Sequence, residues 1–262
     1  MSTDTTFSNL QVQAKSGYVI VTLDRGRANP INAGLISDLR AVLKETAEDD
    51  SVQGMILAGK ENFFSAGLDL IEMYDYDEPT LLQFWKDFMA VIHELAAWPK
   101  PMIAAVTGHA PAGGCIFAMG ADWRVMAEGK YKIGLNEVPV GIIVPPHIQD
   151  LYEFWIGQQR AYQFLLEGKM VSPEVAQEIG LVNDVVGPEE VIPTAEKKLK
   201  QYLGYHPQVW RLTKANLRRR VLKSMEDFDF DAVFQPALDM WWEPNNRAMM
   251  KMMVEGLKSK KG

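Results

Sequence analysis

Residues 102–119 read Met-Ile-Ala-Ala-Val-Thr-Gly-His-Ala-Pro-Ala-Gly-Gly-Cys-Ile-Phe-Ala-Met. Met102 to Val106 is an apolar run of strand length that ends at Thr107-Gly108, which indicates a buried strand. The Gly113-Gly114 pair stands where an apolar helical stretch begins. The first N–H groups of a helix have no partner within it and carry partial positive charge. The stretch therefore predicts a buried strand that leads to a set of free backbone donors.

Before this stretch, predicted strands alternate with predicted helices along the chain. Apolar runs at Val19 to Leu23 and Val52 to Ala58 predict two more buried strands. Between them, apolar residues at helical spacing behind Asn32 predict an amphipathic helix over 33–48, and a longer helical pattern runs from Leu81 to Leu95. This alternation is typical of an α/β fold in which helices connect parallel strands.

Helical patterns dominate the last part of the chain. Several short ones follow Pro146, and Asn183 to Val186 predicts one more strand. From Pro207 onward only helical periodicity remains. We therefore predict an α/β core over residues 1–200 and a helical region over 201–262 that serves packing and oligomerisation.

Composition limits the class of protein. The chain has 262 residues, a net charge of −7 and 47% hydrophobic residues, which is typical of a globular domain and argues against nucleic-acid binding. No apolar run approaches the roughly 20 residues of a membrane span, and Met1 to Val12 shows no export or transit signal. Cys115 is the single cysteine, which excludes an internal disulfide and favours a reducing compartment. We predict a cytoplasmic protein that binds neither nucleic acid nor membrane.

Two features of the helical region need their own interpretation. Arg218-Arg219-Arg220 is predicted to be a solvated helix face, because one basic turn is a common surface feature. The methionines from Met249 to Met253 are typical of packing or of a subunit interface. A flexible lid over an apolar ligand is the alternative for them.

Two loops in the sequence can present backbone donors to a common ligand atom. The segment Phe63 to Leu70 follows the second apolar run, and its Ala66-Gly67 pair allows a turn with exposed N–H groups. The segment Gly108 to Cys115 offers the helix start described above. Two such groups aimed at one oxygen that gains negative charge form an oxyanion hole.

A lone acid follows in unusually apolar surroundings. Glu137 lies within Ile133 to Pro145, where most neighbours are apolar. A carboxylate in an apolar wall has a raised pKa unless it is paired, which suits proton transfer near neutral pH. A loop acid that faces water and a buried ion pair are the alternatives. Ile116 offers no second carboxylate on the helix that follows the Gly-Gly turn.

These segments together resemble the crotonase, or enoyl-CoA hydratase/isomerase, superfamily, and within it most closely the Δ3,Δ2-enoyl-CoA isomerases. The resemblance runs from Val19 to about Val186. It is carried by Ser65-Ala66-Gly67-Leu68-Asp69-Leu70, Pro111-Ala112-Gly113-Gly114-Cys115, Ala121-Asp122-Trp123-Arg124, Gly134-Leu135-Asn136-Glu137 and Gly141-Ile142-Ile143.

The resemblance implies a fold, a substrate class and an assembly. The fold is a crotonase-like spiral of ββα units with a C-terminal helical region, and the assembly is a homotrimer or a dimer of trimers. The substrate is an acyl-CoA thioester, with no metal and no redox cofactor. By position, the N–H groups of Leu68 and Gly113 would hold the thioester oxygen, and Ile116 would contact the acyl group. Coenzyme A would lie against Arg27, Ala28, Ala66, Gly67, Leu68, Asp69 and Leu70.

Two comparisons within the superfamily favour isomerisation. Its hydratases carry a second glutamate where this chain has Ile116, and water addition needs both acids to orient water and deliver a proton. Its dienoyl-CoA isomerases carry an aspartate where this chain has Pro145. We therefore expect Glu137 alone to move a proton from C2 to C4 of a 3-enoyl-CoA, giving 2-trans-enoyl-CoA in the β-oxidation of unsaturated fatty acids.

Other functions and roles stay open at this point. A hydratase that recruits Asp69 or Tyr74 is the alternative enzyme, and a CoA-binding or assembly subunit without turnover is the alternative from another class. Cys115 could act as a nucleophile, but a small buried cysteine is common. His109 is more often structural than catalytic in such a loop, and Asp69 is expected to cap the next helix. The aromatic face of Phe84, Trp85 and Phe88 is predicted to be core, with an acyl wall as its second use.

Overall fold

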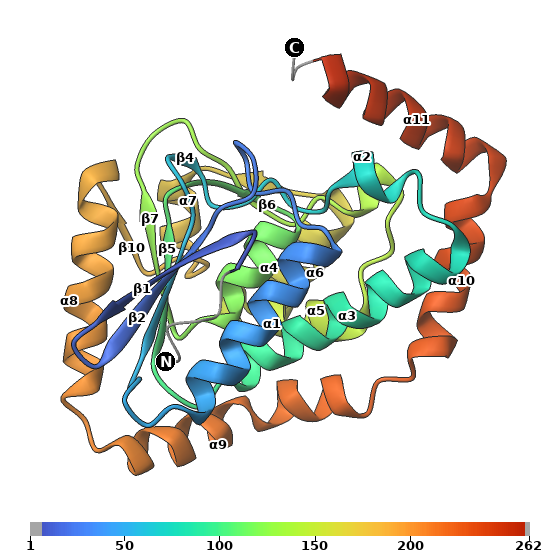
Figure 1. The fold of residues 1–262 in the computed structure, drawn as a ribbon. Helices are drawn as coiled ribbons and strands as arrows, with labels where there is room; N and C mark the ends of the chain where they lie inside the picture. The colour runs from blue at the N-terminus through green and yellow to red at the C-terminus, as the bar shows by residue number, and fades with distance from the viewer. Residues whose placement is uncertain (1–6, 260–262) are drawn as a thin grey trace.

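Six strands form the central sheet of the computed structural model, which describes residues 7–259 (Figure 1). Their order across the sheet is β1 (Leu10–Lys15), β2 (Tyr18–Leu23), β3 (Met55–Ala58), β5 (Met102–Val106), β7 (Trp123–Ala127) and β10 (Asp184–Val186). β1 is antiparallel to β2, and the other neighbours are parallel. The predicted parallel sheet is confirmed. Residues 1–6 and 260–262, which end the two predicted regions and include part of Met1 to Val12, lie outside the described residues.

A second sheet extends the strands of the first. It contains β4 (Asn62–Phe63), β6 (Gly108–Pro111), β8 (Ile133–Gly134) and β9 (Met170–Val171). β3, β5 and β7 each continue along the chain into a short strand of this sheet and then into helices. The molecule is thus built from repeated ββα units, as the resemblance implies.

Helices cover both faces of the central sheet. Their bounds are α1 (Ala33–Glu48), α2 (Leu70–Met73), α3 (Glu78–Ala97), α4 (Gly113–Gly120), α5 (Pro146–Ile156), α6 (Gln158–Glu167), α7 (Pro173–Glu178), α8 (Val191–Leu203), α9 (Pro207–Glu226), α10 (Phe230–Trp242) and α11 (Pro244–Ser259), with short 3₁₀ turns at Val138–Val140 and Pro188–Glu190. Asn32 and Ser172 accept hydrogen bonds as N-caps of α1 and α7, which confirms the helix start predicted behind Asn32.

Alternation along the strands divides the core between the two faces. Figure 1 shows α8 alone on one side of the sheet, with α1, α3 and α4 on the other. Ile20 and Ile56 face α8 in the smaller cluster, whereas Val21 and Leu57 belong to the larger one. Successive side chains of a strand point to opposite faces, so the continuous apolar runs of the sequence follow from burial on both sides.

The helical region begins by packing on the core. α9 lies against α3 and α5, and its Arg218 is buried, donating to the carbonyls of Ala96 at 2.8 Å and Gly120 at 2.7 Å. Arg218 also pairs with Asp122 at 3.2 Å. The prediction of a solvated face over residues 218–220 is therefore wrong at Arg218, because these carbonyls at the ends of other helices need a donor that sequence spacing does not reveal.

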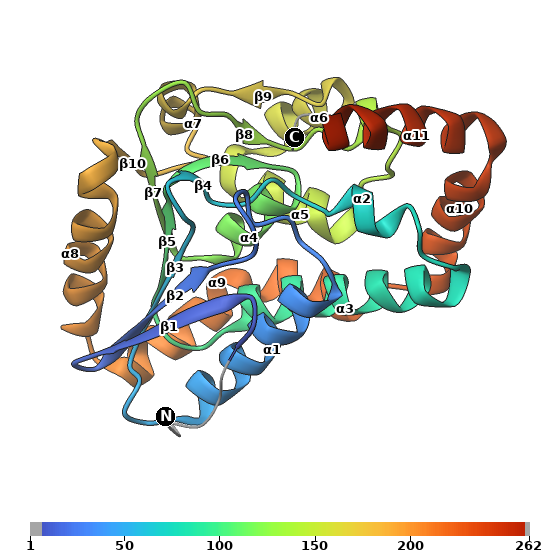
Figure 2. The same ribbon diagram turned by 45° about the horizontal axis from the view of Figure 1, so that its top comes forward.

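The last helix reaches back across the molecule. α11 contacts α2 at the end of the molecule shown in Figure 2, and the Arg247 guanidinium lies 3.7 Å from the centre of the Tyr74 ring. Met250 and Val254 are buried on this helix, whereas Met252 is exposed. Within residues 7–259 no helix has both the length and the apolar content needed to cross a membrane.

Candidate active site

The loop before α2 is fixed by its buried polar groups. Ser65 donates through Oγ to the Asn29 carbonyl at 2.7 Å and accepts from the Gly67 N–H at 3.1 Å. Ile31 pairs with the next turn, because its N–H donates to the Gly67 carbonyl and its carbonyl accepts from Asp69, both at 2.8 Å. The N–H of Leu68 faces away from this pairing and has no acceptor within residues 7–259. It is a free, rigidly held donor.

The start of α4 supplies a second free donor. Ala112, at φ +46°, donates its N–H to the Gly134 carbonyl at 2.8 Å, and Ile116 makes the first hydrogen bond of the helix, to the Ala112 carbonyl at 3.0 Å. The N–H of Gly113 precedes this bond and has no acceptor in the described part of the chain. The predicted position of a helix N-terminus at the Gly-Gly pair is confirmed.

Glycine brings the two donors side by side. A Cβ atom at Gly67 would lie 3.1 Å from the Pro111 carbonyl oxygen and 3.5 Å from the Gly113 nitrogen. A Cβ atom at Gly114 would lie 2.6 Å from the Ser65 carbonyl oxygen. The two loops therefore touch through backbone atoms. Leu68 and Gly113 are the sequence neighbours of Gly67 and Gly114, the glycines at this contact.

Glu137 stands at the turn between β8 and the 3₁₀ turn that follows it. Its side chain is buried, with the residue 7% exposed, and Oε2 has no hydrogen-bond partner within residues 7–259. Burial raises the pKa of the Glu137 carboxyl to about 7, and N–H groups of Glu137 and Asn136 oppose that shift. The structure excludes both a solvent-facing acid and, over residues 7–259, an ion pair at this position. The raised pKa comes from desolvation.

One narrow cavity brings the predicted groups together. Ten residues line it: Leu68, Trp85, Phe88, Gly113, Ile116, Glu137, Ile142, Ile143, Pro145 and Ile148. Glu137 is the only ionisable residue among them, and Ile116 and Pro145 are apolar. An unpaired acid and two free backbone donors beside apolar side chains suit the transfer of a proton to and from a group whose oxygen gains negative charge.

Asp69 and Tyr74 lie outside this cavity. Asp69 caps α2 by accepting from the Glu72 N–H and pairs with Arg25 at 2.6 Å. The Tyr74 ring lies under Arg247. The capping role predicted for Asp69 is confirmed, and neither residue lines the cavity as a second acid.

The predicted CoA segments are joined by one hydrogen bond. The Ala66 N–H donates to the Ala28 carbonyl at 2.8 Å, so the loops containing Arg27 and Leu70 lie next to each other. Arg27 is exposed, and Leu70 begins α2. Sequence reasoning missed Asn29, whose buried side chain accepts from the Arg25 N–H at 2.9 Å and donates to the Phe64 carbonyl at 3.0 Å. The Asn29-Pro30 dipeptide, which favours a turn, was the available signal in the sequence.

Two other candidates have structural surroundings. Cys115 is fully buried behind Ile116, and burial raises the pKa of its thiol, which keeps it protonated. His109 accepts from the Lys132 N–H at 3.1 Å, and its ring contacts those of Phe63 and Tyr131. Within residues 7–259 no cluster of three or more His, Cys, Asp or Glu side chains could hold a metal ion.

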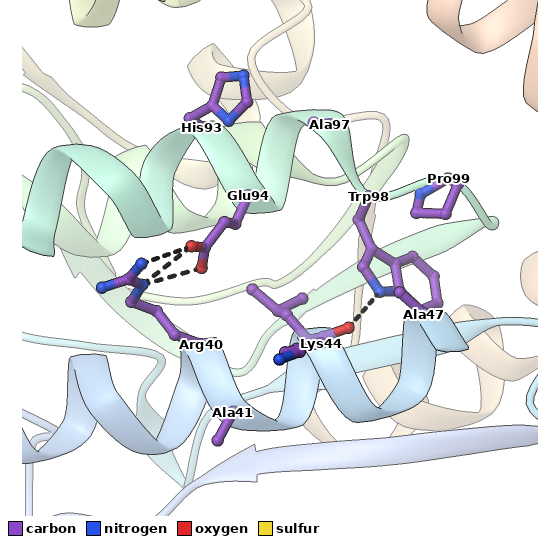
Figure 3. Close-up of a pocket in the computed structure, with 10 residues that line it drawn as sticks. Arg40, Ala41, Lys44, Ala47, His93, Glu94, Ala97, Trp98 and Pro99 are labelled. Atoms are coloured by element: carbon purple, nitrogen blue, oxygen red, sulfur yellow. Dashed lines mark hydrogen bonds and ion pairs between the residues drawn. The ribbon is translucent and has the colours of Figure 1, made fainter. Parts of the chain in front are cut away.

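A larger groove between α1 and α3 contains none of the predicted site residues (Figure 3). Arg40 on one wall pairs with Glu94 at 2.9 Å and with Asp87 at 2.7 Å. Trp98 donates from its ring to the Leu43 carbonyl at 3.1 Å. The one acid that lines this groove, Glu94, is therefore paired, unlike Glu137.

Comparison with known proteins agrees with this geometry. The profile of the enoyl-CoA hydratase/isomerase family matches residues 13–252. Mitochondrial enoyl-CoA delta isomerase 1 of Mus musculus is 29% identical over 97% of this chain and 88% of its own. A Rhizobium meliloti protein described as a probable enoyl-CoA hydratase is 35% identical over 73% of this chain and 75% of its own. The crystal structure of human mitochondrial delta3-delta2-enoyl-CoA isomerase superposes with a TM-score of 0.92 at 29% identity, covering 97% of this chain and all of that one. This chain belongs to the enoyl-CoA hydratase/isomerase family.

Proposed function

We propose that this protein isomerises 3-enoyl-CoA to 2-trans-enoyl-CoA. The observation that carries the proposal is a cavity in which one acid, Glu137, faces two free backbone donors and seven apolar side chains. The relatives described above include proteins named as isomerases and as hydratases, so their names alone do not choose between the two reactions. The residues that line the cavity favour isomerisation over hydration.

The reaction follows from the positions of these groups. Ionised Glu137 removes a proton from C2, the electrons move into the thioester, and the N–H groups of Leu68 and Gly113 stabilise the resulting dienolate oxygen. The same carboxyl then returns the proton at C4, which leaves the double bond between C2 and C3. Each donor of an oxyanion hole lowers the barrier by about 3 kcal/mol. A carboxyl with a pKa of about 7 is suited both to accept and to return the proton.

Hydration is disfavoured by the opposite wall of the cavity. A water that attacks C3 needs hydrogen-bond partners, and Ile116 and Pro145 offer no side-chain polar group there. A reaction that only relocates a proton has no such need.

We further propose how the rest of the substrate binds. Ala66 to Leu70 would lie along coenzyme A, and Arg27 with Ala28 would face its adenine end, supported by the hydrogen bond that joins these two loops. No metal or redox group takes part in the proposed chemistry. Mutation of Arg27 to Ala is then expected to raise KM without changing kcat.

The assembly and location of the protein are also proposals. A homotrimer or dimer of trimers is supported by exposed apolar side chains near the cavity, which include Val138, Tyr162, Leu166 and Met240. Light scattering on the purified protein tests it.

A cytoplasmic location rests on the lone cysteine, whereas relatives described above are mitochondrial proteins. Cell fractionation distinguishes the two, and the proposed pathway is the β-oxidation of unsaturated fatty acids.

Product analysis of the wild type and two variants tests the proposed reaction. With a 3-enoyl-CoA, the wild type should give the 2-trans isomer of unchanged mass, and a 2-enoyl-CoA should take up no water. Glu137→Gln should lose at least 100-fold in kcat with acyl-CoA affinity retained, as expected when a general base is removed. Glu128→Gln, which changes an exposed acid next to β7, is the control. Hydration without bond migration would reject the proposal, and CoA binding without turnover would indicate a binding subunit.

A further inference from the structure

A buried tyrosine hydroxyl near Glu137 has no partner. Tyr152 on α5 is fully buried, and within residues 7–259 its hydroxyl makes no hydrogen bond. Burial raises the pKa of this phenol, so the hydroxyl remains a proton donor across the physiological range. A buried hydroxyl without a partner costs about 1 to 3 kcal/mol, and such groups in folded proteins usually bond to an internal water.

The fold places Tyr152 behind the wall of the cavity. Ile148 lines the cavity with Glu137, and Tyr152 follows one helical turn later on the same face of α5. α5 packs against α4, where the Trp155 ring nitrogen donates to the Met119 carbonyl at 2.9 Å. Cys115 precedes Ile116 on α4 and, like Tyr152, is not among the residues that line the cavity.

Three polar groups therefore converge on one buried region. The hydroxyl of Tyr152 interacts electrostatically with Cys115 and Glu137, and Cys115 interacts in the same way with Glu137. Oε2 of Glu137 lacks a partner, as the Tyr152 hydroxyl does. A donor and an acceptor that do not reach each other, with a thiol beside them, are the surroundings in which one water makes two or three hydrogen bonds.

We infer that Tyr152 is a positioning residue for Glu137. Its hydroxyl donates to a buried water, and this water donates to Oε2 of the ionised carboxylate, which orients Oε1 towards C2 and C4 of the acyl chain. The inference rests on the proposed function for its catalytic meaning, since it assigns the oxygen that moves the proton. The water-mediated contact between Tyr152 and Glu137 does not depend on which reaction is catalysed.

The hydrogen bonds from Tyr152 through the water to Glu137 make the proton affinity of Glu137 depend on Tyr152. The titratable groups that face Glu137 are Cys115 from α4 and Tyr152 from α5, with Arg124 acting on Cys115 from β7. The end of α6 and α11 touch the turn after Glu137 through Gly168, Asn246 and Met249, which carry no charge. A donor to a carboxylate stabilises its charged form, so loss of the hydroxyl should raise the pKa of Glu137.

Carbon-13 NMR titration of the Glu137 carboxyl tests the inference in Tyr152→Phe. Protein labelled in glutamate is titrated with pH, and the Glu137→Gln spectrum identifies the signal. The Glu137 midpoint should rise by about one pH unit or more in Tyr152→Phe. Tyr18→Phe, which removes a hydroxyl bonded to Glu196 at 2.6 Å on the α8 side of the sheet, should leave the midpoint unchanged.

The activity profile supplies the second readout. The midpoint of kcat/KM against pH should move up by the same amount in Tyr152→Phe, and kcat above that midpoint should return to within a few-fold of the wild type. Tyr152→Leu serves if the phenylalanine variant does not fold. An unchanged Glu137 midpoint in a folded Tyr152 variant overturns the inference. A wild type that does not isomerise overturns the proposed function instead, and the NMR midpoint still decides the role of Tyr152.

Discussion

The burial of the Glu137 carboxyl has two consequences, one for proton transfer to and from a ligand and one for the stability of the fold. Its burial raises the pKa of the carboxyl from 4.5 to about 7, so near neutral pH both protonation states are populated. The same burial makes the ionised form unfavourable in the folded protein. The two consequences are measured independently.

The first consequence is a pH dependence of activity. Only ionised Glu137 can accept the C2 proton, so kcat/KM should rise about tenfold per pH unit below 7 and level off above it. Initial rates with a 3-enoyl-CoA from pH 5 to 9 give the profile. A profile that is already flat at pH 5 would mean that the base has an ordinary carboxyl pKa.

The second consequence is a pH dependence of stability. The folded state binds the Glu137 proton more tightly than the unfolded state, so wild-type stability should fall as pH rises from 4.5 to about 7. Glu137→Gln lacks this loss and should be more stable than the wild type at pH 8, by up to about 3 kcal/mol. Urea unfolding at pH 5 and pH 8 measures it. An equal or lower stability of the variant at pH 8 would contradict the raised pKa.

The sequence predicts the surroundings of some single residues and not those of others. The burial of Glu137 follows from its apolar neighbours in the chain, and the sequence predicts it. Asn29 and Tyr152 become informative only through partners on other elements, Asn29 with Phe64 and Ser65 and Tyr152 with Cys115 and Glu137. No local pattern marks a side chain whose partner is distant in sequence.

Among the structural elements, the contact between the loop before α2 and the start of α4 decides where the donors lie. Both elements carry glycine at this contact, Gly67 in the loop and Gly114 in α4, because backbone meets backbone there. A side chain at Gly114 would place Cβ 2.6 Å from the Ser65 carbonyl oxygen, and the rigid loop cannot yield without moving Leu68.

Gly114→Ala should therefore slow the reaction by separating the two donors. We expect kcat/KM to fall between roughly tenfold and a hundredfold, because a displacement near 1 Å has that effect on a positioned group. The pH midpoint should stay unchanged, since Glu137 is on another element. Gly256→Ala is the control, because a Cβ there would meet no atom within 4 Å. Full activity of Gly114→Ala would show that the donor geometry does not matter.

Elements with strong periodic patterns are predicted well. The helix expected over 33–48 and the strand at Met102 to Val106 have the observed bounds. β1 was not predicted, because its side chains are mostly polar and only Leu10 is buried. The strands of the second sheet are two to four residues long, too short for a period to show.

At the scale of the whole molecule, contacts of α9 with the core hold the start of the helical region, residues 201–262, in place. Arg218 bonds to Ala96, Gly120 and Ala121, and Lys214 pairs with Asp122 at 2.8 Å. These contacts join residues about a hundred positions apart in the chain, which is why the sequence alone indicated an ordinary basic surface. The proposed role of residues 201–262 in packing and oligomerisation remains a prediction beyond this contact.

Comparison of two neighbouring arginines tests this anchor. Arg218→Ala should lower the free energy of unfolding by about 3 kcal/mol or more, because it leaves buried carbonyls without donors. Arg220→Ala changes an exposed side chain and should stay within about 0.5 kcal/mol of the wild type. Chemical denaturation measures both. Equal effects of the two substitutions would mean that α9 is not held by Arg218.

The central claim is that one carboxyl both removes and returns the proton. A 3-enoyl-CoA with deuterium at both C2 positions, followed by NMR during a single turnover in ordinary water, tests it most directly. Because Glu137 is buried in an apolar cavity, its proton should exchange slowly with solvent, and part of the deuterium removed from C2 should appear at C4 of the 2-trans product. A product whose C4 carries only solvent hydrogen would show that a second group protonates C4 and would contradict the single-base mechanism.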